Sequence, residues 1–462
     1  MSLTPAQLDG LRDIAGADNV ATDADSLTEY GRDWTRFYEP TPSAIVFARS
    51  IEQLQAVVRF ARDEGLPLVP SGGRTGLSGG AVARDGEVVI SFARMNRILG
   101  FNATDRTVEV EAGVITATLQ QFAEDNQLFY PVDFASSGSS HIGGNIATNA
   151  GGIKVLRYGL TRDWVAGLKV ITGDGELLDL NHGLVKNATG YDLRQLFVGA
   201  EGTLGLIVQA TMRLTTPPAG LGVMLLAVPD MRHTISILDR FRSAVPVTAF
   251  EFFSDLALDH VLARTGGSAP FADRTDYYVL IEYEDAGVEE AALAAFEAVV
   301  EAGEVTDGVL SQSEQQSRTL WSYREHISES ITPHTPYKND IAVRISDVPA
   351  FLGAVEDTVN ARYPDFEIVW FGHIGDGNLH LNILKPESLT VDTFKRECES
   401  VSEEVMAIVA DYHGSVAAEH GVGLLKRDQL HYSRSAGELA LMRSLKASFD
   451  PGGIMNPGKV LA

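Results

Sequence analysis

The chain has 462 residues, of which 45% are hydrophobic and 21% are charged, and its formal net charge is -25. This length exceeds what one hydrophobic core usually serves, so we expect at least two domains, and the composition excludes a disordered or fibrous protein. Because the acidic residues are spread along the chain, the charge argues against a nucleic-acid partner and against binding to an anionic membrane.

The first thirty residues carry five aspartates and no apolar run, which predicts neither a secretory signal nor a membrane span. We therefore expect a cytoplasmic protein without stable membrane insertion. The single cysteine, Cys398, cannot form an intramolecular disulfide or a cysteine-based metal cluster. Any bound metal must then be held by His, Asp or Glu.

Up to Pro217-Pro218, short β-branched runs alternate with helical segments and many glycines, which indicates an α+β domain dense in loops. After the two prolines, strand-like stretches are separated by longer amphipathic helices. The tail from Met455 is again rich in turn formers, which suggests a return to the first domain. The strands predicted by these patterns are 44–47, 88–91, 107–110, 223–228, 277–282 and 341–345, and the helices are 51–64, 288–302, 313–330 and 393–412.

The first glycine-rich loop, residues 70–80, follows an apolar run and contains five glycines. Such a loop lets backbone N–H groups surround an anion, and phosphate is the natural guest, although a mobile surface loop would have the same composition. It fits neither the spacing of a Rossmann turn nor that of a P-loop, so a nicotinamide or nucleotide-hydrolase function loses its usual support.

Two further segments, 143–152 and 197–205, are also rich in glycine, and three such loops in one domain suggest one large ligand. The set resembles the FAD-binding domain of the vanillyl-alcohol oxidase/PCMH flavoprotein family, over nearly the whole chain. The resemblance implies that the first loop wraps the pyrophosphate, the second lies along the ribityl chain and isoalloxazine, and the third approaches the adenine. The first loop has Arg74 and no histidine, so we expect noncovalent FAD. The cofactor-binding residues implied are Pro70, Ser71, Gly72, Gly73, Arg74, Thr75, Gly76, Ser78, Gly143, Gly144, Asn145, Thr148, Asn149, Gly152, Glu201, Gly202, Ile207 and Asn456.

Residues 368–383 read as two strands joined by Asp376-Gly377, a strong hairpin signal. A two-residue turn would place His373 directly opposite His380 on one face, with Cβ atoms about 4.5–5.5 Å apart, close enough to share one ion. On that face Asn382 would lie opposite Phe371, while the other face would be core. A lone strand histidine is usually structural, but this pairing favours a metal site.

A third ligand is available at Glu419, next to His420 in a glycine-rich turn. Two histidines and one glutamate form an open set for a catalytic divalent cation such as Zn²⁺. The motifs 372–380 and 419–421 look like those of the flavoprotein branch that contains D-2-hydroxyglutarate and D-lactate dehydrogenases. The resemblance implies that His373, His380 and Glu419 bind the metal, and that His420 is the general base.

Arg324 and Ser328 are four residues apart on the predicted helix 313–330, and Lys338 follows. A guanidinium and an ammonium could hold two carboxylates, although a solvated helix face would look the same. The resemblance favours substrate binding by Arg324, Ser328, Lys338, Asn382 and His420, with Ser328 where threonine is more usual. Arg344 has no assigned role.

The fold class expected is α+β, with a PCMH-type FAD domain at 1–217, an antiparallel-sheet cap with helices on one side at 218–421, and a segment 422–462 that returns to the FAD domain. The resemblance implies oxidation of D-2-hydroxyglutarate to 2-oxoglutarate, with hydride passing from Cα to flavin N5. Electron-transfer flavoprotein or a quinone would accept the electrons, and a homodimer is possible. The alternatives are a D-lactate, glycolate or D-malate dehydrogenase, a noncatalytic flavin or metal carrier, and a flavin-free metal hydrolase.

Overall fold

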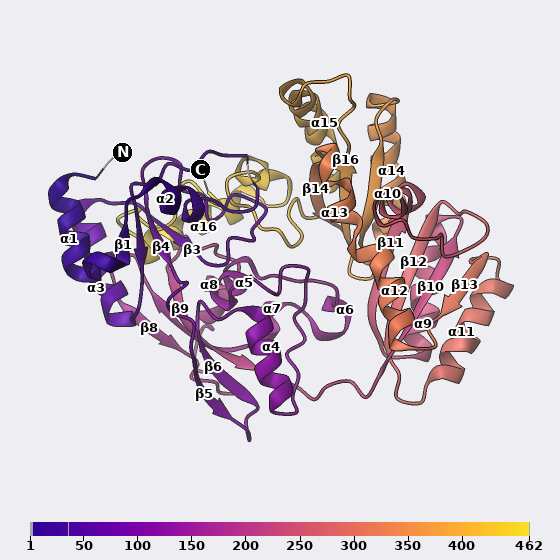
Figure 1. Ribbon diagram of the computed structural model, residues 1–462, viewed down its shortest axis with the longest axis horizontal. Helices are drawn as coiled ribbons and strands as arrows, with labels where there is room; N and C mark the ends of the chain where they lie inside the picture. The colour runs from indigo at the N-terminus through magenta and orange to yellow at the C-terminus, as the bar shows by residue number, and fades with distance from the viewer. Residues whose placement is uncertain (1–2, 36, 462) are drawn as a thin grey trace. The chain divides into compact units, whose positions relative to one another are not determined.

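The computed structural model describes residues 3–35 and 37–461 and divides into two compact units (Figure 1). Unit 1 comprises Met1–Gly151, Gly159–Pro217 and Glu419–Ala462, and unit 2 comprises Gly152–Tyr158 and Pro218–Ala418. This division differs from the expected boundaries in two places, because it puts residues 152–158 in unit 2 and residues 419–421 in unit 1.

Unit 1 contains two sheets. In the smaller sheet, of order β1-β2-β4-β3, the strands β2, β4 and β3 are parallel, and β1 joins the edge antiparallel to β2. The larger sheet is antiparallel and has the order β5-β6-β9-β7-β8. The strands are β1 (Val20–Ala21), β2 (Ala44–Phe47), β3 (Leu68–Ser71), β4 (Val88–Ser91), β5 (Ile98–Asn102), β6 (Thr107–Glu111), β7 (Val165–Ile171), β8 (Leu177–Leu180) and β9 (Leu206–Arg213).

The helices of unit 1 cover these sheets through apolar faces. Helix α3 shows how the sequence sets its ends: the Ser50 side chain accepts the Gln53 N–H at the start, and Gly65 ends the helix with φ +65°. Its buried face packs with α1 against the smaller sheet. The helices are α1 (Pro5–Ala15), α2 (Ala24–Tyr30), α3 (Ile51–Glu64), α4 (Thr116–Asp125), α5 (Ile142–Thr148), α7 (Thr161–Trp164), α8 (Arg194–Phe197) and α16 (Ala436–Phe449), with 3₁₀ turns at Ala17–Asn19 and Arg427–Tyr432.

Unit 2 is built on one seven-stranded antiparallel sheet of order β13-β10-β12-β11-β15-β16-β14. Its strands are β10 (Leu221–Val228), β11 (Val247–Ser254), β12 (Tyr277–Glu284), β13 (Asp307–Leu310), β14 (Tyr337–Ala342), β15 (Ile368–His373) and β16 (Asn378–Ile383). The sequence predicts a strand at 341–345, but the observed strand β14 ends earlier, at Ala342. A 3₁₀ helix begins at Ile345 instead.

Helices lie on both faces of this sheet, which corrects the expectation that they lie on one side. Strand β11 is buried at every position, so both of its faces must be covered. On one face Trp321 of α12 donates to Glu282 at 3.2 Å, and on the other Phe296 of α11 packs against Gly308. The helices are α6 (Val155–Tyr158), α9 (Thr234–Ala244), α10 (Asp255–Thr265), α11 (Glu289–Glu301), α12 (Glu314–Glu325), α13 (Ile327–Ile331), α14 (Val348–Arg362) and α15 (Val391–Asp411), with 3₁₀ turns at Met231–His233, Thr332–His334 and Ile345–Asp347.

The segment 152–158 interrupts unit 1 in sequence and is fixed to the sheet of unit 2 by ion pairs. Lys154 Nζ lies 2.6 Å from Glu282 Oε1, and Arg157 Nε lies 3.0 Å from Glu284 Oε1. The Glu282 carboxylate also accepts from Thr248 at 2.6 Å. Since Lys154 and Glu282 are nearly buried, this pair holds α6 on strand β12.

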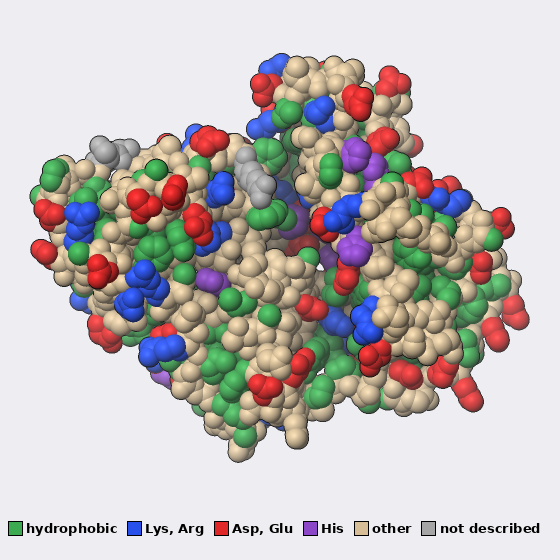
Figure 2. Space-filling model, viewed as in Figure 1, with side chains coloured by type: hydrophobic (Ala, Val, Ile, Leu, Met, Phe, Trp, Pro, Cys, Tyr) green, Lys and Arg blue, Asp and Glu red, His purple; other side chains and the backbone are tan. Residues whose placement is uncertain are grey.

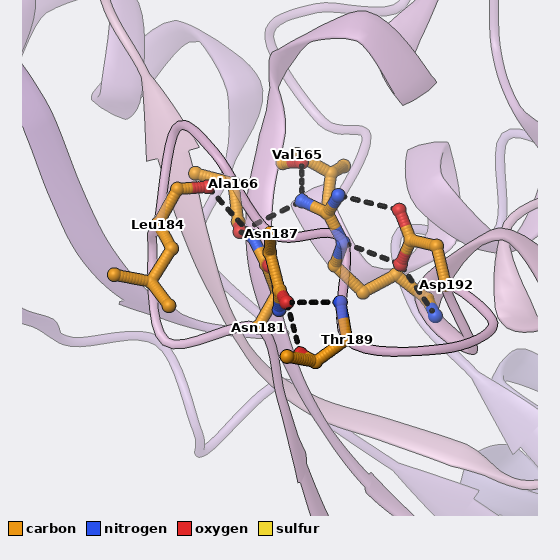
Figure 3. A network of polar contacts seen from close by, with 8 residues as sticks. Val165, Ala166, Asn181, Leu184, Asn187, Thr189 and Asp192 are labelled. Atoms are coloured by element: carbon orange, nitrogen blue, oxygen red, sulfur yellow. Dashed lines mark hydrogen bonds and ion pairs between the residues drawn. The ribbon is translucent and has the colours of Figure 1, made fainter.

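A long loop follows β8 in unit 1 and is held by a polar network (Figure 3). The Arg194 guanidinium donates to the carbonyls of Val165 and Ala166 at 2.9 and 2.8 Å and pairs with Asp192. Asn181 Nδ2 donates to Ala166 O and Leu184 O. These bonds hold the loop in place, although the side chain of Tyr191 in the same loop is 96% exposed and adds little packing.

The visible surface of each unit carries scattered acidic side chains, as the net charge of -25 requires (Figure 2). Within residues 3–35 and 37–461, no helix is both long and apolar enough to cross a membrane.

The C-terminal segment is part of unit 1. Met455 pairs with Leu68 beside β3, and Lys446 Nζ donates to Thr203 O at 2.8 Å. The buried carboxylate of Glu201 accepts the N–H groups of Val422 and Gly423 at 2.7 and 2.9 Å. Burial raises the pKa of Glu201 to about 7, against the lowering effect of these two hydrogen bonds.

The raised pKa of Glu201 predicts a pH-dependent stability. Because the folded chain keeps this proton up to about pH 7 while the unfolded chain releases it near 4.5, stability is lost as pH rises between these values. Relative to Glu201→Gln, the wild-type chain without FAD should lose about 3 kcal/mol of unfolding free energy from pH 4.5 to 8. Urea unfolding at several pH values measures this, and a difference that does not change with pH would refute it.

Candidate functional site

The three glycine-rich loops of unit 1 line one cavity of about 140 Å³. The predicted cofactor-binding residues that line it are Pro70, Gly72, Gly73, Arg74, Thr75, Gly76, Ser78, Gly143, Gly144, Asn145, Thr148, Glu201, Gly202 and Ile207. The loops that lie far apart in the sequence are thus brought to one place, as a single large ligand would require.

Four predicted cofactor-binding residues lie outside this lining. Ser71 is buried in β3, and Asn149 ends α5 in the left-handed region with its Oδ1 accepting the Arg162 N–H. Gly152 belongs to unit 2. Asn456 supports the loops instead, because its Nδ2 donates to Gly80 O at 2.9 Å and to Glu201 O at 2.7 Å.

The glycines in these loops serve two different purposes. A Cβ on Gly73 would lie 2.2 Å from Ser139 O, and one on Gly143 would lie 2.6 Å from Ala112 Cβ, so both are required by close packing. A Cβ on Gly144 would meet none of the described protein atoms within 4 Å, although Gly144 lines the cavity. Gly144 therefore leaves space that a ligand can fill.

Two polar side chains in the cavity wall were missed by the sequence analysis. His141 is 9% exposed, and within the described chain its Nδ1 has no hydrogen-bond partner. Burial, with a smaller effect of Arg74, lowers the pKa of His141 to about 4, so its ring is neutral at pH 7. Oδ2 of the buried Asp33 likewise lacks a partner among the described residues, and burial raises the pKa of this carboxyl. Such unpaired buried atoms fit a wall that contacts a polar ligand.

In unit 2 the predicted hairpin exists, but its predicted register is wrong. Strands β15 and β16 pair His373 with Asn378 and Phe371 with His380, so residues 374–377 form a four-residue connection. The Gly375 N–H donates to Phe250 O of β11, and this tertiary bond replaces the two-residue turn. Asn382 lies opposite Val369. His373 and His380 are therefore diagonal neighbours on the same face, with ring centroids 5.4 Å apart.

A buried carboxylate of the neighbouring strand contacts one of these histidines. Glu251 of β11 is 1% exposed, and its Oε1 lies 2.8 Å from His373 Nδ1. Its Oε2 lies 2.8 Å from Nη2 of Arg324, which is 7% exposed and lies over the Phe371 ring. Glu251 was missed, although one carboxylate in the apolar run 247–253 is a signal that could have identified it.

The second histidine lies beside another buried carboxylate. His380 Nδ1 is 3.6 Å from Oδ1 of Asp340 in β14, and Asn378 Nδ2 donates to the same oxygen at 2.8 Å. Asp340 is a further possible ligand that the sequence analysis did not assign. Asn382, which is buried, donates through Nδ2 to the carbonyls of Val369 and His380.

The predicted helix 313–330 is interrupted, which corrects the expectation that Arg324 and Ser328 share one helix face. Helix α12 ends at Glu325 and α13 begins at Ile327, so Arg324 is buried whereas Ser328 is exposed. Ser328 Oγ instead accepts from Lys338 Nζ at 3.1 Å. Partial desolvation lowers the pKa of Lys338, although the side chain reaches the surface.

Arg344, which had no assigned role, forms an exposed ion pair with Asp347 at 2.8 Å. Glu419 and His420 begin the last segment of unit 1, and Glu419 Oε1 lies 3.8 Å from His420 Nε2. The carboxylate of Glu201 fixes the turn that follows them, through the N–H groups of Val422 and Gly423.

The chain matches two protein-family models. Residues 42–181 match an FAD binding domain, and residues 218–460 match the C-terminal domain of FAD linked oxidases. The second match covers more than half of the chain.

The chain is also similar to curated proteins over its whole length. It is 59% identical to D-2-hydroxyglutarate dehydrogenase of Stutzerimonas stutzeri over 99% of both chains, and 51% identical to the enzyme of that name from Xanthomonas citri, over 99% of this chain and 97% of that protein. A mitochondrial putative D-lactate dehydrogenase of Schizosaccharomyces pombe is 33% identical over 96% of this chain and 86% of that protein.

Among solved structures, p-cresol methylhydroxylase with bound substrate superposes with a TM-score of 0.75 at 16% identity, over 99% of this chain and 97% of that one. This likeness confirms the PCMH-type α+β fold. Together with the match of both family models, it shows that the chain belongs to the FAD-linked oxidases, a family of flavin-dependent oxidoreductases.

Proposed function

We propose that this chain oxidises D-2-hydroxyglutarate to 2-oxoglutarate with noncovalent FAD and a divalent metal, most suitably Zn²⁺. The observation that carries the proposal is the pair of buried imidazoles on one sheet face, in a chain that also has an FAD-binding domain. The 59% identical relative that bears the name D-2-hydroxyglutarate dehydrogenase supports the choice of substrate.

Unit 1 fits FAD through the cavity that the glycine-rich loops line. A bound dinucleotide would use the space beside Gly144 and Nδ1 of His141, which has no hydrogen-bond partner among the described residues. The first loop contains no histidine for a covalent link, which supports a noncovalent cofactor.

His373, His380 and Glu419 would hold the metal, and Asp340, which lies beside His380, would offer one more ligand atom. Imidazole and carboxylate donors without cysteine suit Zn²⁺ and other borderline divalent ions. When bound, the metal supplies a Lewis acid for the substrate's hydroxyl and carboxylate, and FAD supplies the acceptor for the Cα hydride.

The remaining side chains would bind and orient the acid. Arg324 supplies a buried positive charge, and Lys338 with Ser328 supplies a second cationic site for the other carboxylate. Asn382 lies on the same sheet face as His380 and would contribute its amide. His420 would take the proton of the substrate's hydroxyl group. The electrons would then pass to electron-transfer flavoprotein or to a quinone.

A smaller D-2-hydroxy acid such as D-lactate is the second candidate, because a 33% identical relative is named a putative D-lactate dehydrogenase. Glycolate, which is achiral, and D-malate, which is itself a dicarboxylate, are further small 2-hydroxy acids. The two buried or partly desolvated cations, Arg324 and Lys338, favour a dicarboxylate over a monocarboxylate.

Anaerobic flavin reduction tests the proposed substrate. D-2-Hydroxyglutarate should bleach the flavin absorbance of the FAD-loaded enzyme at least about tenfold more efficiently than D-lactate, because the second carboxylate gains a charged partner. Protein treated with a chelator should stay yellow and lose this bleaching. Faster reduction by D-lactate would contradict the substrate, and full bleaching without metal would contradict the metal.

The substitution Gly144→Ala tests where FAD lies. A methyl group there meets no described protein atom within 4 Å, so thermal unfolding of the apoprotein should be unchanged or slightly improved. The dissociation constant for FAD, measured by flavin fluorescence, should rise about tenfold or more. Gly138→Ala, equally open but outside the cavity lining, is the matched control and should bind FAD normally. Normal FAD affinity in Gly144→Ala would place the cofactor elsewhere.

Replacing His420 by Ala tests the general base. The rate of flavin reduction should fall by about 10²- to 10⁴-fold, the usual contribution of general acid–base catalysis, while FAD content stays unchanged. Stopped-flow reduction at saturating substrate measures this rate. A variant as fast as the wild-type enzyme would reject the role of His420.

A further inference from the structure

Glu251 occupies a position that the proposed site does not yet use. It is a nearly fully buried glutamate on a central strand of the seven-stranded sheet, and its two carboxylate oxygens point to two different partners. Oε1 contacts Nδ1 of His373 at 2.8 Å, and Oε2 contacts Nη2 of Arg324 at 2.8 Å.

The contact with His373 determines how that imidazole is used. An ionised carboxylate can only accept hydrogen bonds, so Nδ1 of His373 carries the proton and Nε2 is the ring nitrogen that would bind a metal. A carboxylate behind a ligating histidine fixes the ring orientation and increases its basicity. The sheet provides this geometry, because extending the β11–β15 register from Phe252–Gly372 places Glu251 opposite His373.

The contact with Arg324 couples the same carboxylate to the proposed substrate cation. The Arg324 guanidinium lies 4.8 Å over the Phe371 ring, and the Phe371 ring lies 5.0 Å from the His380 ring. Within the described chain, Arg324 Nε has no hydrogen-bond partner. The ion pair therefore holds the guanidinium in place and leaves its Nε donor for a substrate carboxylate.

We propose that Glu251 is a positioning residue that orients His373 toward the metal and Arg324 toward the substrate. This inference rests on the proposed function, since it takes His373 as a metal ligand. Loss of Glu251 should therefore weaken both metal binding and substrate binding, although Glu251 itself would contact neither the metal nor the substrate.

Zinc affinity of the FAD-loaded enzyme tests the first half of the proposal. Competition with a chromophoric chelator should show that the zinc dissociation constant rises about tenfold in Glu251→Gln, which can still offer one weaker acceptor, and by up to about 100-fold in Glu251→Ala. The visible spectrum of the Co²⁺-substituted enzyme should change in both variants, because His373 is no longer held in one orientation.

Glu282→Gln is the matched control. Glu282 is also a buried glutamate in this sheet, on the adjacent strand β12, and it pairs with the cation Lys154 but with none of the described histidines. Its replacement should lower thermal stability without changing the zinc affinity or the Co²⁺ spectrum. If Glu251→Ala does not fold, the double variant Glu251→Gln/Arg324→Gln removes both charges and is compared with Arg324→Gln alone.

The outcomes separate this inference from the proposed function. If His373→Ala weakens zinc binding but neither Glu251 variant does, or if Glu282→Gln weakens it equally, the role of Glu251 is overturned and the metal site stands. If His373→Ala binds zinc as the wild type does, the metal assignment fails and the role of Glu251 fails with it.

The KM for D-2-hydroxyglutarate tests the second half of the proposal, that Glu251 orients Arg324 toward the substrate. Glu251→Gln should raise this KM about tenfold, and an unchanged KM would overturn that half.

Discussion

The structure of unit 2 depends on the pairing of charges inside a sheet that is covered on both faces. Strands β11 and β12 are buried along nearly their whole length, so a carboxylate on either strand needs a cationic or donating partner. Glu282 has Lys154, Thr248 and Trp321, while Glu251 has His373 and Arg324. The first set holds the segment 152–158 on the sheet, and the second set assembles the groups that the proposed chemistry needs.

Unit 1 depends on a different feature, because the cavity proposed for its ligand is lined by many glycines. Gly73 and Gly143 let chain segments approach more closely than a side chain would permit, and Gly144 lines the cavity without filling it. The loops stay in place through long-range bonds from the C-terminal segment, such as those of Asn456 to Gly80 and Glu201. A cavity of this kind fits the large polar cofactor of an FAD-binding domain.

Much of this arrangement could be predicted from local signals in the sequence. The helix 51–64 was predicted at its observed bounds, and in the structure a capping serine and a terminal glycine mark these ends. The three loops were recognised from their glycine content. The hairpin was recognised from its Asp-Gly dipeptide, but its register was not, since the bond from Gly375 to Phe250 comes from a strand more than one hundred residues away.

Long-range packing also explains the other errors. The helix 313–330 is broken at His326, so that Ile327 and Ile331 enter the core while Ser328 reaches solvent. His141 and Asp33 gain significance only because the fold buries them beside the glycine-rich loops. The segment 152–158 joins unit 2 through side chains whose acidic partners lie far along the chain, in β12.

Anomalous diffraction at the zinc edge, from crystals of the FAD-loaded enzyme, would test the proposed metal site most directly. We predict one zinc ion bound through Nε2 of His373 and by His380, with His373 Nδ1 still hydrogen-bonded to Glu251. Zinc bound through His373 Nδ1 with Glu251 turned away, or no zinc at these histidines, would contradict it.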